Sequence, residues 1–364
     1  MKRSIIGLWV AAAILAGPAL AGNPPAIEWE RAFGPDTSCG PVRQTLDGGY
    51  ILAGIVRVLD GNGYTTRKPY LERLDSLGST HWRRVYDSLP YGGNGAYGVR
   101  QANDGGYVFD TYGGDSVLTV VVVKTDSQGG VQWSYLDEAE SPYWLTGGTC
   151  TTADGGVAVA GFCISDSIFL LKLDSAGNRV WLRRFHDTRS RDWGIGTVPV
   201  AQTASGGYIV GSDRLLRTDS LGNQMWRVGF DLVYAIFDVA PTPDGGYVAT
   251  GVGGNKRAWM NRNRYKLCLL KVNSQGALQW RKLFAFSDDG TQGISVDVTS
   301  DGGYFVCGED GTGMAVRFNA QGVELWRKSE LNGNCWASSG RQTVDGGYVI
   351  AVHDKLIKLA ADAE

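Results

Sequence analysis

The chain has few of the residues that most often bind metals or act in catalysis. Among its 364 residues are three histidines and six cysteines, and no two cysteines form a Cys-x-x-Cys pair. The sequence also has no His-Glu-x-x-His zinc motif, no Gly-x-Ser-x-Gly nucleophile motif and no phosphate-binding loop. We therefore predict no catalytic residues, no metal site and no cofactor, and we favour a binding protein over an enzyme.

Long apolar runs are also absent, apart from one near the start. Lys2 and Arg3 precede an apolar stretch at positions 5–15, which is followed by the small-residue sequence Ala19-Leu20-Ala21. A basic start, a short apolar run and a small-residue cleavage site are typical of a secretory signal peptide. We predict a signal peptide over residues 1–21 and a mature chain, periplasmic or extracellular, without a transmembrane segment.

The charge balance has no strong excess of either sign. The chain holds 35 basic and 37 acidic residues, a formal net charge of −2. A strongly basic surface is the usual mark of proteins that bind nucleic acid or anionic membranes. The composition therefore argues against both partners.

Export makes disulfide bonds chemically possible. Cys39 and Cys335 occupy similar positions, eight and ten residues before repeated Asp-Gly-Gly turns at Asp47 and Asp345. We hypothesise a disulfide between them. The alternative is that they are buried, unreactive thiols, which is the interpretation we prefer for Cys268 and Cys307 inside apolar strands.

Glycine, in contrast, is abundant, with 52 residues, and much of it lies in two repeated motifs. The first is a turn of the form Asp-Gly-Gly-Tyr. Its first residues are Asp47, Asp104, Asp154, Ser205, Asp244, Asp301 and Asp345. The second is a polar turn followed seven positions later by tryptophan, and its pairs are Asp75 and Trp82, Asp126 and Trp133, Asp174 and Trp181, Asp219 and Trp226, Asn273 and Trp280, and Asn319 and Trp326.

These motifs predict hairpins. Asp, Asn or Ser at the start of a turn accepts hydrogen bonds from the backbone two residues on, and a later glycine supplies a positive φ. The runs between the turns, such as VLTVVVV at 117–123, are rich in β-branched residues and have no helical period. A repeat of about fifty residues with four short strands is typical of a β-propeller.

The motif count predicts seven blades and the way the ring closes. Seven Asp-Gly-Gly-like turns occur, but the seventh repeat ends after Leu356–Leu359 without its tryptophan strand. The segment Ile27–Phe33 has the same Trp-x-Arg-x-Phe form as Trp181–Phe185. We predict one all-β domain over residues 22–364, a seven-bladed propeller of four-stranded antiparallel blades, in which the N-terminal strand completes the last blade. Such closure removes open sheet edges and favours a monomer.

The predicted strand order places the two tight turns of every blade on one face of the disc, which we call the turn face. The longer loops lie together on the other, the variable-loop face, where function usually resides. Aromatic residues in or near these loops are candidate ligand contacts: Tyr97, Trp144, Trp193, Tyr234, Trp259 and Trp336. They suit stacking on sugars or gripping a peptide, whereas the plainer alternative is packing between blades.

Two groups of charged residues keep other functions open. The loop at 251–266 carries several basic residues around Trp259, either as a clamp for an anionic group or as a solvated loop. The acidic groups at 137–140 and at Asp288-Asp289 offer paired carboxylates, as glycoside hydrolases require. An exported carbohydrate-active enzyme, hydrolase or lyase, is therefore the alternative to a binding module.

The segment 172–181, KLDSAGNRVW, resembles the tryptophan-docking turn of quinoprotein-type propellers at Asp174, Gly177 and Trp181. The counterparts of these residues extend over nearly all of the mature chain. Quinoprotein propellers usually have eight blades, and their dehydrogenases use an adjacent cysteine pair and metal-ligating acids that are not evident here, so no cofactor is implied. The DGGY and DSxGxxW pattern looks closer to secreted bacterial propeller-repeat proteins of unassigned role.

Together these features predict a secreted binding module at the bacterial envelope, with a carbohydrate or protein ligand. By analogy with propellers that hold peptide strands, an envelope-assembly scaffold is a further possibility.

Overall fold

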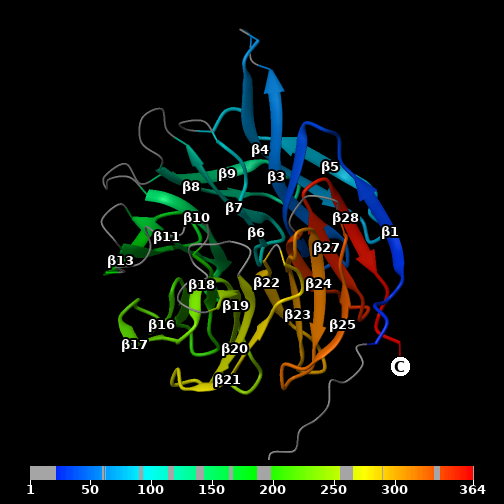
Figure 1. Ribbon diagram of the computed structural model, residues 1–364. Helices are drawn as coiled ribbons and strands as arrows, with labels where there is room; N and C mark the ends of the chain where they lie inside the picture. Colours follow the sequence, from blue (N-terminus) through cyan, green and yellow to red (C-terminus); the bar gives the residue numbers. More distant parts are fainter. Residues whose placement is uncertain are drawn as a thin grey trace, which may run out of the picture.

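The repeats form a ring of seven β-sheets, which confirms the predicted seven-bladed propeller (Figure 1). The computed structural model describes residues 22–363 except 60, 62, 90–92, 114–118, 137–142, 164–166, 187–197, 255–264, 289 and 332–336. In this part of the chain every regular element is a β-strand, and each sheet has four antiparallel strands. The predicted signal peptide lies outside the described residues, so it stays a prediction.

Each of the first six blades uses four consecutive strands, which run in order from the first to the fourth. Blade 1 contains β2 (Thr37–Gln44), β3 (Tyr50–Leu59), β4 (Thr65–Leu74) and β5 (Thr80–Val85), and blade 2 contains β6 (Gly98–Gln101), β7 (Tyr107–Gly113), β8 (Thr119–Thr125) and β9 (Val131–Leu136). Blade 3 contains β10 (Tyr143–Thr151), β11 (Val157–Cys163), β12 (Ser167–Leu173) and β13 (Arg179–His186), and blade 4 contains β14 (Val200–Gln202), β15 (Tyr208–Gly211), β16 (Arg214–Thr218) and β17 (Gln224–Gly229). Blade 5 contains β18 (Val233–Pro241), β19 (Tyr247–Gly253), β20 (Lys266–Val272) and β21 (Leu278–Phe284), and blade 6 contains β22 (Gln292–Val298), β23 (Tyr304–Glu309), β24 (Gly313–Phe318) and β25 (Glu324–Lys328).

Blade 7 joins the two ends of the chain. It contains β26 (Ala337–Gln342), β27 (Tyr348–Val352) and β28 (Lys355–Leu359), and its fourth strand is β1 (Ile27–Ala32). Trp29 of β1 pairs with Lys358 of β28, as the sequence predicts, and Figure 1 shows the blue β1 beside the red β28. The ring therefore leaves no blade with an incomplete sheet.

The Asp-Gly-Gly turn is built around a buried cation. In blade 5, Nζ of Lys271 lies 2.7 Å from Oδ2 of Asp244 and also donates to the carbonyl of Val272. Gly245 has a φ of +79°, which disfavours any side chain, and a Cβ at Gly246 would stand 2.5 Å from the lysine Nζ. The first glycine of the motif therefore supplies the turn conformation, and the second leaves room for the cation and for the carbonyl oxygen of Val272, which would lie still closer to a Cβ there.

The same ion pair recurs around the ring, although the sequence analysis did not predict it. The other pairs are Asp47 with Arg73, Asp104 with Lys124, Asp154 with Lys172, Asp301 with Arg317 and Asp345 with Lys358. Blade 4 is the exception, because Ser205 replaces the aspartate and its hydroxyl accepts a hydrogen bond of 2.6 Å from Arg217.

The repeated tryptophan joins each blade to the next. The Trp82 indole of blade 1 donates to the carbonyl of Ser127 in the blade 2 turn, at 3.2 Å, and covers Gly129 of that turn. Its ring also stands edge-on to Tyr107, the tyrosine of the blade 2 Asp-Gly-Gly-Tyr motif, with ring centroids 5.7 Å apart. Such contacts bury large aromatic surfaces between blades. The repeated tryptophan thus packs on the neighbouring blade, with the tyrosine of the Asp-Gly-Gly-Tyr motif as its partner.

The arrangement repeats with one interruption. Aromatic pairs of the same kind are Trp29 with Tyr50, Trp181 with Tyr208, Trp226 with Tyr247, Trp280 with Tyr304 and Trp326 with Tyr348. Trp133 lacks a tyrosine partner of this kind because Val157 occupies that position in blade 3.

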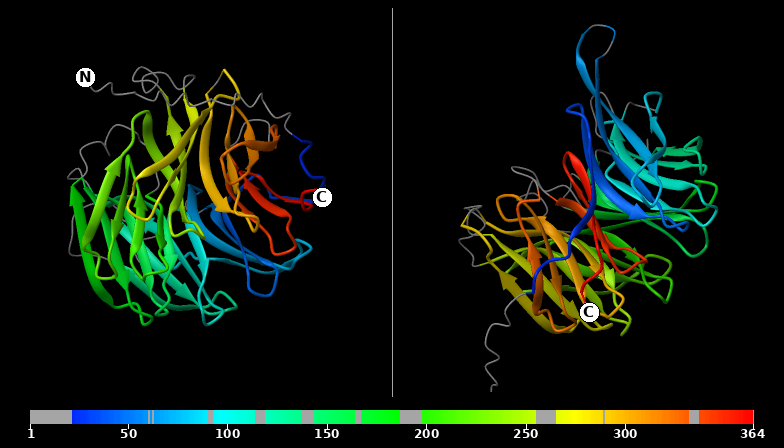
Figure 2. Two further views of the ribbon diagram at one scale, coloured as in Figure 1. Left: turned by 90° about the horizontal axis from the view of Figure 1, so that it is seen from below. Right: turned by 90° about the vertical axis from the view of Figure 1, so that its right-hand side faces the viewer.

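The antiparallel order gives the disc its two predicted faces. Turns between first and second strands, and between third and fourth strands, lie on the turn face. The strand ends that flank the connections between second and third strands, and between blades, point to the opposite face, the variable-loop face. The longest described projection is the hairpin of β3 and β4, which extends beyond the disc (Figures 1 and 2).

Candidate functional site

The structure describes only part of the predicted aromatic set. Tyr97 precedes β6, and its amide donates a hydrogen bond to the carbonyl of Asp110 at 3.1 Å. It therefore lies where the chain enters the first strand of blade 2. Trp144 lies on β10, but its side chain is outside the described residues. Trp193, Trp259 and Trp336 also lie outside them. The binding role of these residues therefore stays a prediction.

Tyr234 is the predicted residue with the best-defined surroundings. It lies at the start of β18, on the variable-loop face, and packs half-buried against a buried cluster of Ala235, Phe237 and Val252. Burial raises the pKa of its hydroxyl. Tyr265, immediately before β20 on the same face, packs against the same cluster. Blade 5 thus presents two half-buried tyrosines, and Tyr265 directly follows its longest loop in sequence.

The predicted Cys39 site lies at the ring seam. The Cys39 amide donates to the carbonyl of His353 in blade 7, at 2.8 Å, and its sulfur lies 3.7 Å from the Gly40 carbonyl. Cys39 is buried and forms no disulfide with a cysteine of the described part of the chain, and burial raises the pKa of its thiol. Cys335 is outside the described residues, so the proposed disulfide stays a prediction.

Most charged candidates for enzyme chemistry also fall outside the described residues. These are the acids at 137–140, Asp289, and the basic loop residues from 256 to 264. Within the described ranges no three His, Cys, Asp or Glu side chains gather closely enough to hold a metal ion. Those ranges also contain no helix of the length and apolarity needed to cross a membrane.

A cluster of charges that the sequence analysis missed lies on the axis of the disc. The first strands of neighbouring blades contact one another there. Five charged side chains on these strands interact electrostatically: Arg43, Arg100, Asp238, Asp297 and Arg341. We call them the axial cluster. Nη2 of Arg341 lies 3.1 Å from Oδ2 of Asp238, although 103 positions and one whole blade separate the two residues.

The five axial side chains are partly buried, and burial and neighbouring charges shift the pKa values of the three arginines and of Asp297. Burial and the neighbouring guanidiniums lower the pKa of both Arg43 and Arg100. Burial opposes the charge of Arg341 as well, but Asp238 and Asp297 raise its pKa above the ordinary value. Burial raises the pKa of Asp297, although Arg341 opposes this. The arginines come from blades 7, 1 and 2, and the aspartates come from blades 5 and 6.

The position of a residue relative to its repeated turn could have identified four members of the axial cluster from the sequence. Each lies four residues before the first residue of its Asp-Gly-Gly turn. The seven residues at this position are Arg43, Arg100, Cys150, Ala201, Ala240, Asp297 and Arg341. Alignment of the repeats by their turns would have shown arginine at three of them, but nothing in the sequence says that they face a common axis.

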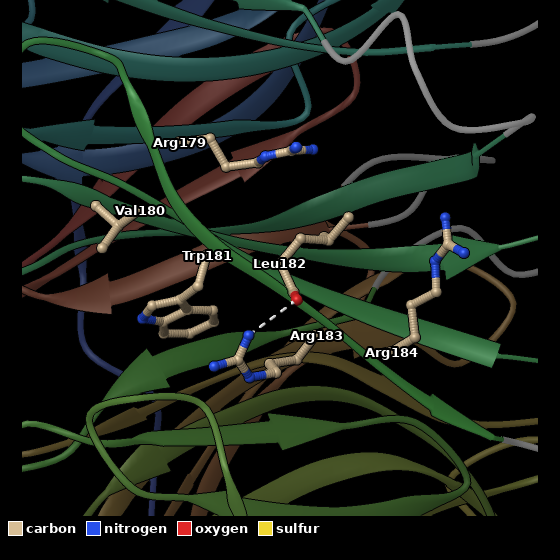
Figure 3. A pocket seen from close by; sticks show the side chains of 6 residues that line it. All are labelled: Arg179, Val180, Trp181, Leu182, Arg183 and Arg184. Atoms are coloured by element: carbon tan, nitrogen blue, oxygen red, sulfur yellow. Dashed lines mark hydrogen bonds between the residues drawn. The ribbon is translucent and has the colours of Figure 1, made fainter.

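A shallow, open hollow of about 540 Å³ lies along β13, at the outer edge of blade 3 (Figure 3). Trp181 and Arg183 point to one side of the strand, and Leu182 and Arg184 to the other. The Arg183 guanidinium carbon lies 5.5 Å from the centroid of the Trp181 ring, and both side chains pack on Gly222 in the turn of blade 4. This hollow therefore belongs to the repeated junction between blades.

No protein-family model matches the sequence, and no curated protein matches it either. Solved structures do match in fold. A streptogramin B lyase is 12% identical with a TM-score of 0.63, covering 92% of this chain and 98% of the lyase. The Pan2 WD40 domain of Neurospora crassa is 10% identical with a TM-score of 0.63, covering 96% and 98%. YCF48 bound to a D1 peptide is 9% identical with a TM-score of 0.56, covering 95% and 98%. At these identities the likeness shows the propeller fold alone.

Proposed function

We propose that this protein is an exported, non-catalytic binding module of the bacterial cell envelope. Its ligand, a carbohydrate or another protein, meets the variable-loop face. The lyase, WD40 and peptide-bound neighbours show that one fold serves different roles. The proposal therefore depends on this chain's own residues and not on the fold.

The observation that carries the proposal is the pair of half-buried tyrosines on blade 5. Tyr234 and Tyr265 are fixed from behind by Phe237 and Val252, and each keeps part of its surface exposed. Fixed, partly exposed aromatic rings lose little conformational freedom when a sugar or a peptide stacks on them. Trp259 belongs to the long loop that precedes Tyr265 in sequence, and we include it in the proposed contact surface.

Export and family relationship form the second part of the proposal. Residues 1–21 direct the chain out of the cytoplasm, and we place it among secreted bacterial propellers with DGGY and DSxGxxW repeats, which are similar in repeat form to quinoprotein-type propellers. Mass spectrometry of the protein from the periplasm or medium should give a chain that begins at Gly22. Recovery of an intact chain that still carries Lys2 would contradict export with cleavage. Light scattering should give the mass of a monomer.

A glycan array and a pull-down from envelope extract, both with residues 22–364, test the ligand. Tyr234→Ala, Trp144→Ala and Trp336→Ala should each weaken binding, whereas His81→Ala on the exposed outer strand β5 should not. Sugar binding that survives all three changes would contradict the assigned surface.

The same experiment separates the alternatives. A protein partner without any sugar binding would exclude the carbohydrate version and favour the assembly scaffold. Release of soluble sugar from a bound glycan would instead identify a hydrolase or lyase and overturn the non-catalytic proposal.

A further inference from the structure

The axial cluster carries more positive than negative charge. It contains three guanidinium groups and two carboxylates, and one of the carboxylates already pairs with an arginine of the cluster. Oδ2 of Asp238 accepts hydrogen bonds from Arg341, at 3.1 Å, and from the amide of Val296, at 3.0 Å. Asp297 accepts a hydrogen bond of 2.9 Å from the amide of Gln342 and forms no ion pair within the described part of the chain.

Arg43 and Arg100 have no carboxylate partner among the described residues. Nη1 of Arg43 donates to its own strand at Val42, at 2.7 Å, and to the Ser339 hydroxyl, at 3.0 Å. Nη1 of Arg100 donates to the carbonyl of Val99, at 3.0 Å. A guanidinium has five N–H donors, so most donors of both side chains are unused by these contacts. The carboxylate of Asp110, on β7 of the same blade, attracts Arg100 but accepts a hydrogen bond from Thr149.

The surroundings hold both arginines in place close to the turn face. Each lies three residues before the tip of its Asp-Gly-Gly turn, roughly 10 Å along a strand. The amide of Leu46 at one such tip donates to Oε1 of Gln101, next to Arg100, at 2.9 Å. The amide of Val344 donates in the same way to Oε1 of Gln44, next to Arg43, at 2.9 Å. These contacts tie blades 7, 1 and 2 together around the arginines.

The turn tips add an apolar rim. Leu46 is 86% exposed and Val344 is 88% exposed, on neighbouring blades. The arginines themselves are half-buried, so solvent still reaches them. Half-buried cations are less screened than surface cations and bind oxyanions through charge-assisted hydrogen bonds.

We propose that Arg43 and Arg100 form a binding site for an oxyanion, a carboxylate or a phosphate, which enters the axis of the disc from the turn face. Leu46 and Val344 favour a ligand in which the anionic group is attached to a small apolar group. This site lies on the face opposite the proposed ligand surface of blade 5 and is independent of it.

The test measures thermal unfolding of residues 22–364 in sodium acetate, sodium butyrate, sodium phosphate and sodium chloride at equal ionic strength. At least one oxyanion should raise the unfolding midpoint in a saturable way, beyond the effect of chloride. Butyrate should act at several-fold lower concentration than acetate. Stronger action of phosphate than of both carboxylates would identify phosphate as the preferred group.

Matched variants locate the site. Arg43→Gln and Arg100→Gln should each weaken the oxyanion effect at least tenfold, whereas Arg67→Gln, on the projecting hairpin of blade 1, should leave it unchanged. Arg100→Lys keeps the charge and should retain part of the effect if the glutamine variant folds poorly. Isothermal titration of the unmodified protein gives a second measurement. An identical response to oxyanions and chloride, or a full response in the double variant R43Q/R100Q, would overturn the proposal.

Discussion

The indole nitrogen of Trp326 lies 2.6 Å from Oδ1 of Asp362 and donates a hydrogen bond to it. In blade 1 the equivalent indole, that of Trp82, donates to a main-chain carbonyl in the turn of the next blade. Blade 7 has no turn between its third and fourth strands, because the fourth strand is β1 from the other end of the chain. Asp362 therefore replaces the missing turn, and its Oδ2 also accepts a hydrogen bond of 2.6 Å from Tyr348.

Replacement of this carboxylate should weaken ring closure. Asp362→Ala leaves the indole N–H and the Tyr348 hydroxyl without their acceptor, and we expect the free energy of unfolding to fall by about 2 kcal/mol. Equilibrium unfolding in urea measures this. Asp288→Ala removes an exposed carboxylate that accepts no hydrogen bond from any residue the structure describes, and it should change stability by less than about 0.5 kcal/mol. Equal stability of the two variants would show that Asp362 does not replace the missing turn.

Blade 4 offers a stabilising substitution. Arg217 is 5% exposed, and Ser205 stands where six other blades have an aspartate. Ser205→Asp gives this buried guanidinium a carboxylate partner, and we expect about 1 kcal/mol of added stability. The reverse change in blade 5, Asp244→Ser, should destabilise the protein because it leaves the buried Lys271 ammonium without its carboxylate partner. Urea unfolding of both variants checks the opposite signs, and a loss of stability in Ser205→Asp would contradict the explanation.

Acid should destabilise the ring through the repeated aspartates. Partial burial opposes the shift, but hydrogen bonds and an ion pair with Lys271 lower the pKa of Asp244 to about 2. The pKa values of the five equivalent aspartates are also lowered. Because an unfolded aspartate has a pKa of about 3.9, this stabilisation is complete above that pH and is lost as the pH falls through the folded values.

The unfolding midpoint should therefore decrease as the pH is lowered from about 4 to about 2. Asp244→Asn removes one titrating group, so the variant should show a shallower decrease over the same range. A variant with the same slope as the unmodified protein would show that Asp244 does not contribute.

The cysteines should divide into two groups. Burial raises the pKa of Cys268 to about 12 and raises that of Cys307 still further, so both thiols should resist iodoacetamide in the folded protein and react after unfolding.

Peptide mapping of exported protein without reductant should detect Cys39 linked to Cys335. Recovery of both as alkylated, unlinked peptides after unfolding would exclude that disulfide, and Cys39→Ser provides the matched control.

The sequence by itself determined the repeat, the number of blades and the pairing of Trp29 with the last blade. Each of these follows from local chemistry, since a polar turn starter, a glycine and a β-branched run specify a hairpin without distant residues. The number of these hairpins then gives the number of blades in the ring. The sequence also marked Tyr234 as a loop-face residue, because strand order alone assigns the faces.

Tertiary structure alone decided which distant residues meet. The pairing of Trp82 with Tyr107 joins two motifs that each look complete within their own blade. The contact of Asp238 with Arg341 requires seven blades to close at one set of angles, so that first strands far apart in the chain share an axis. No local pattern encodes that convergence, because burial and charge balance at the axis depend on all seven strands together.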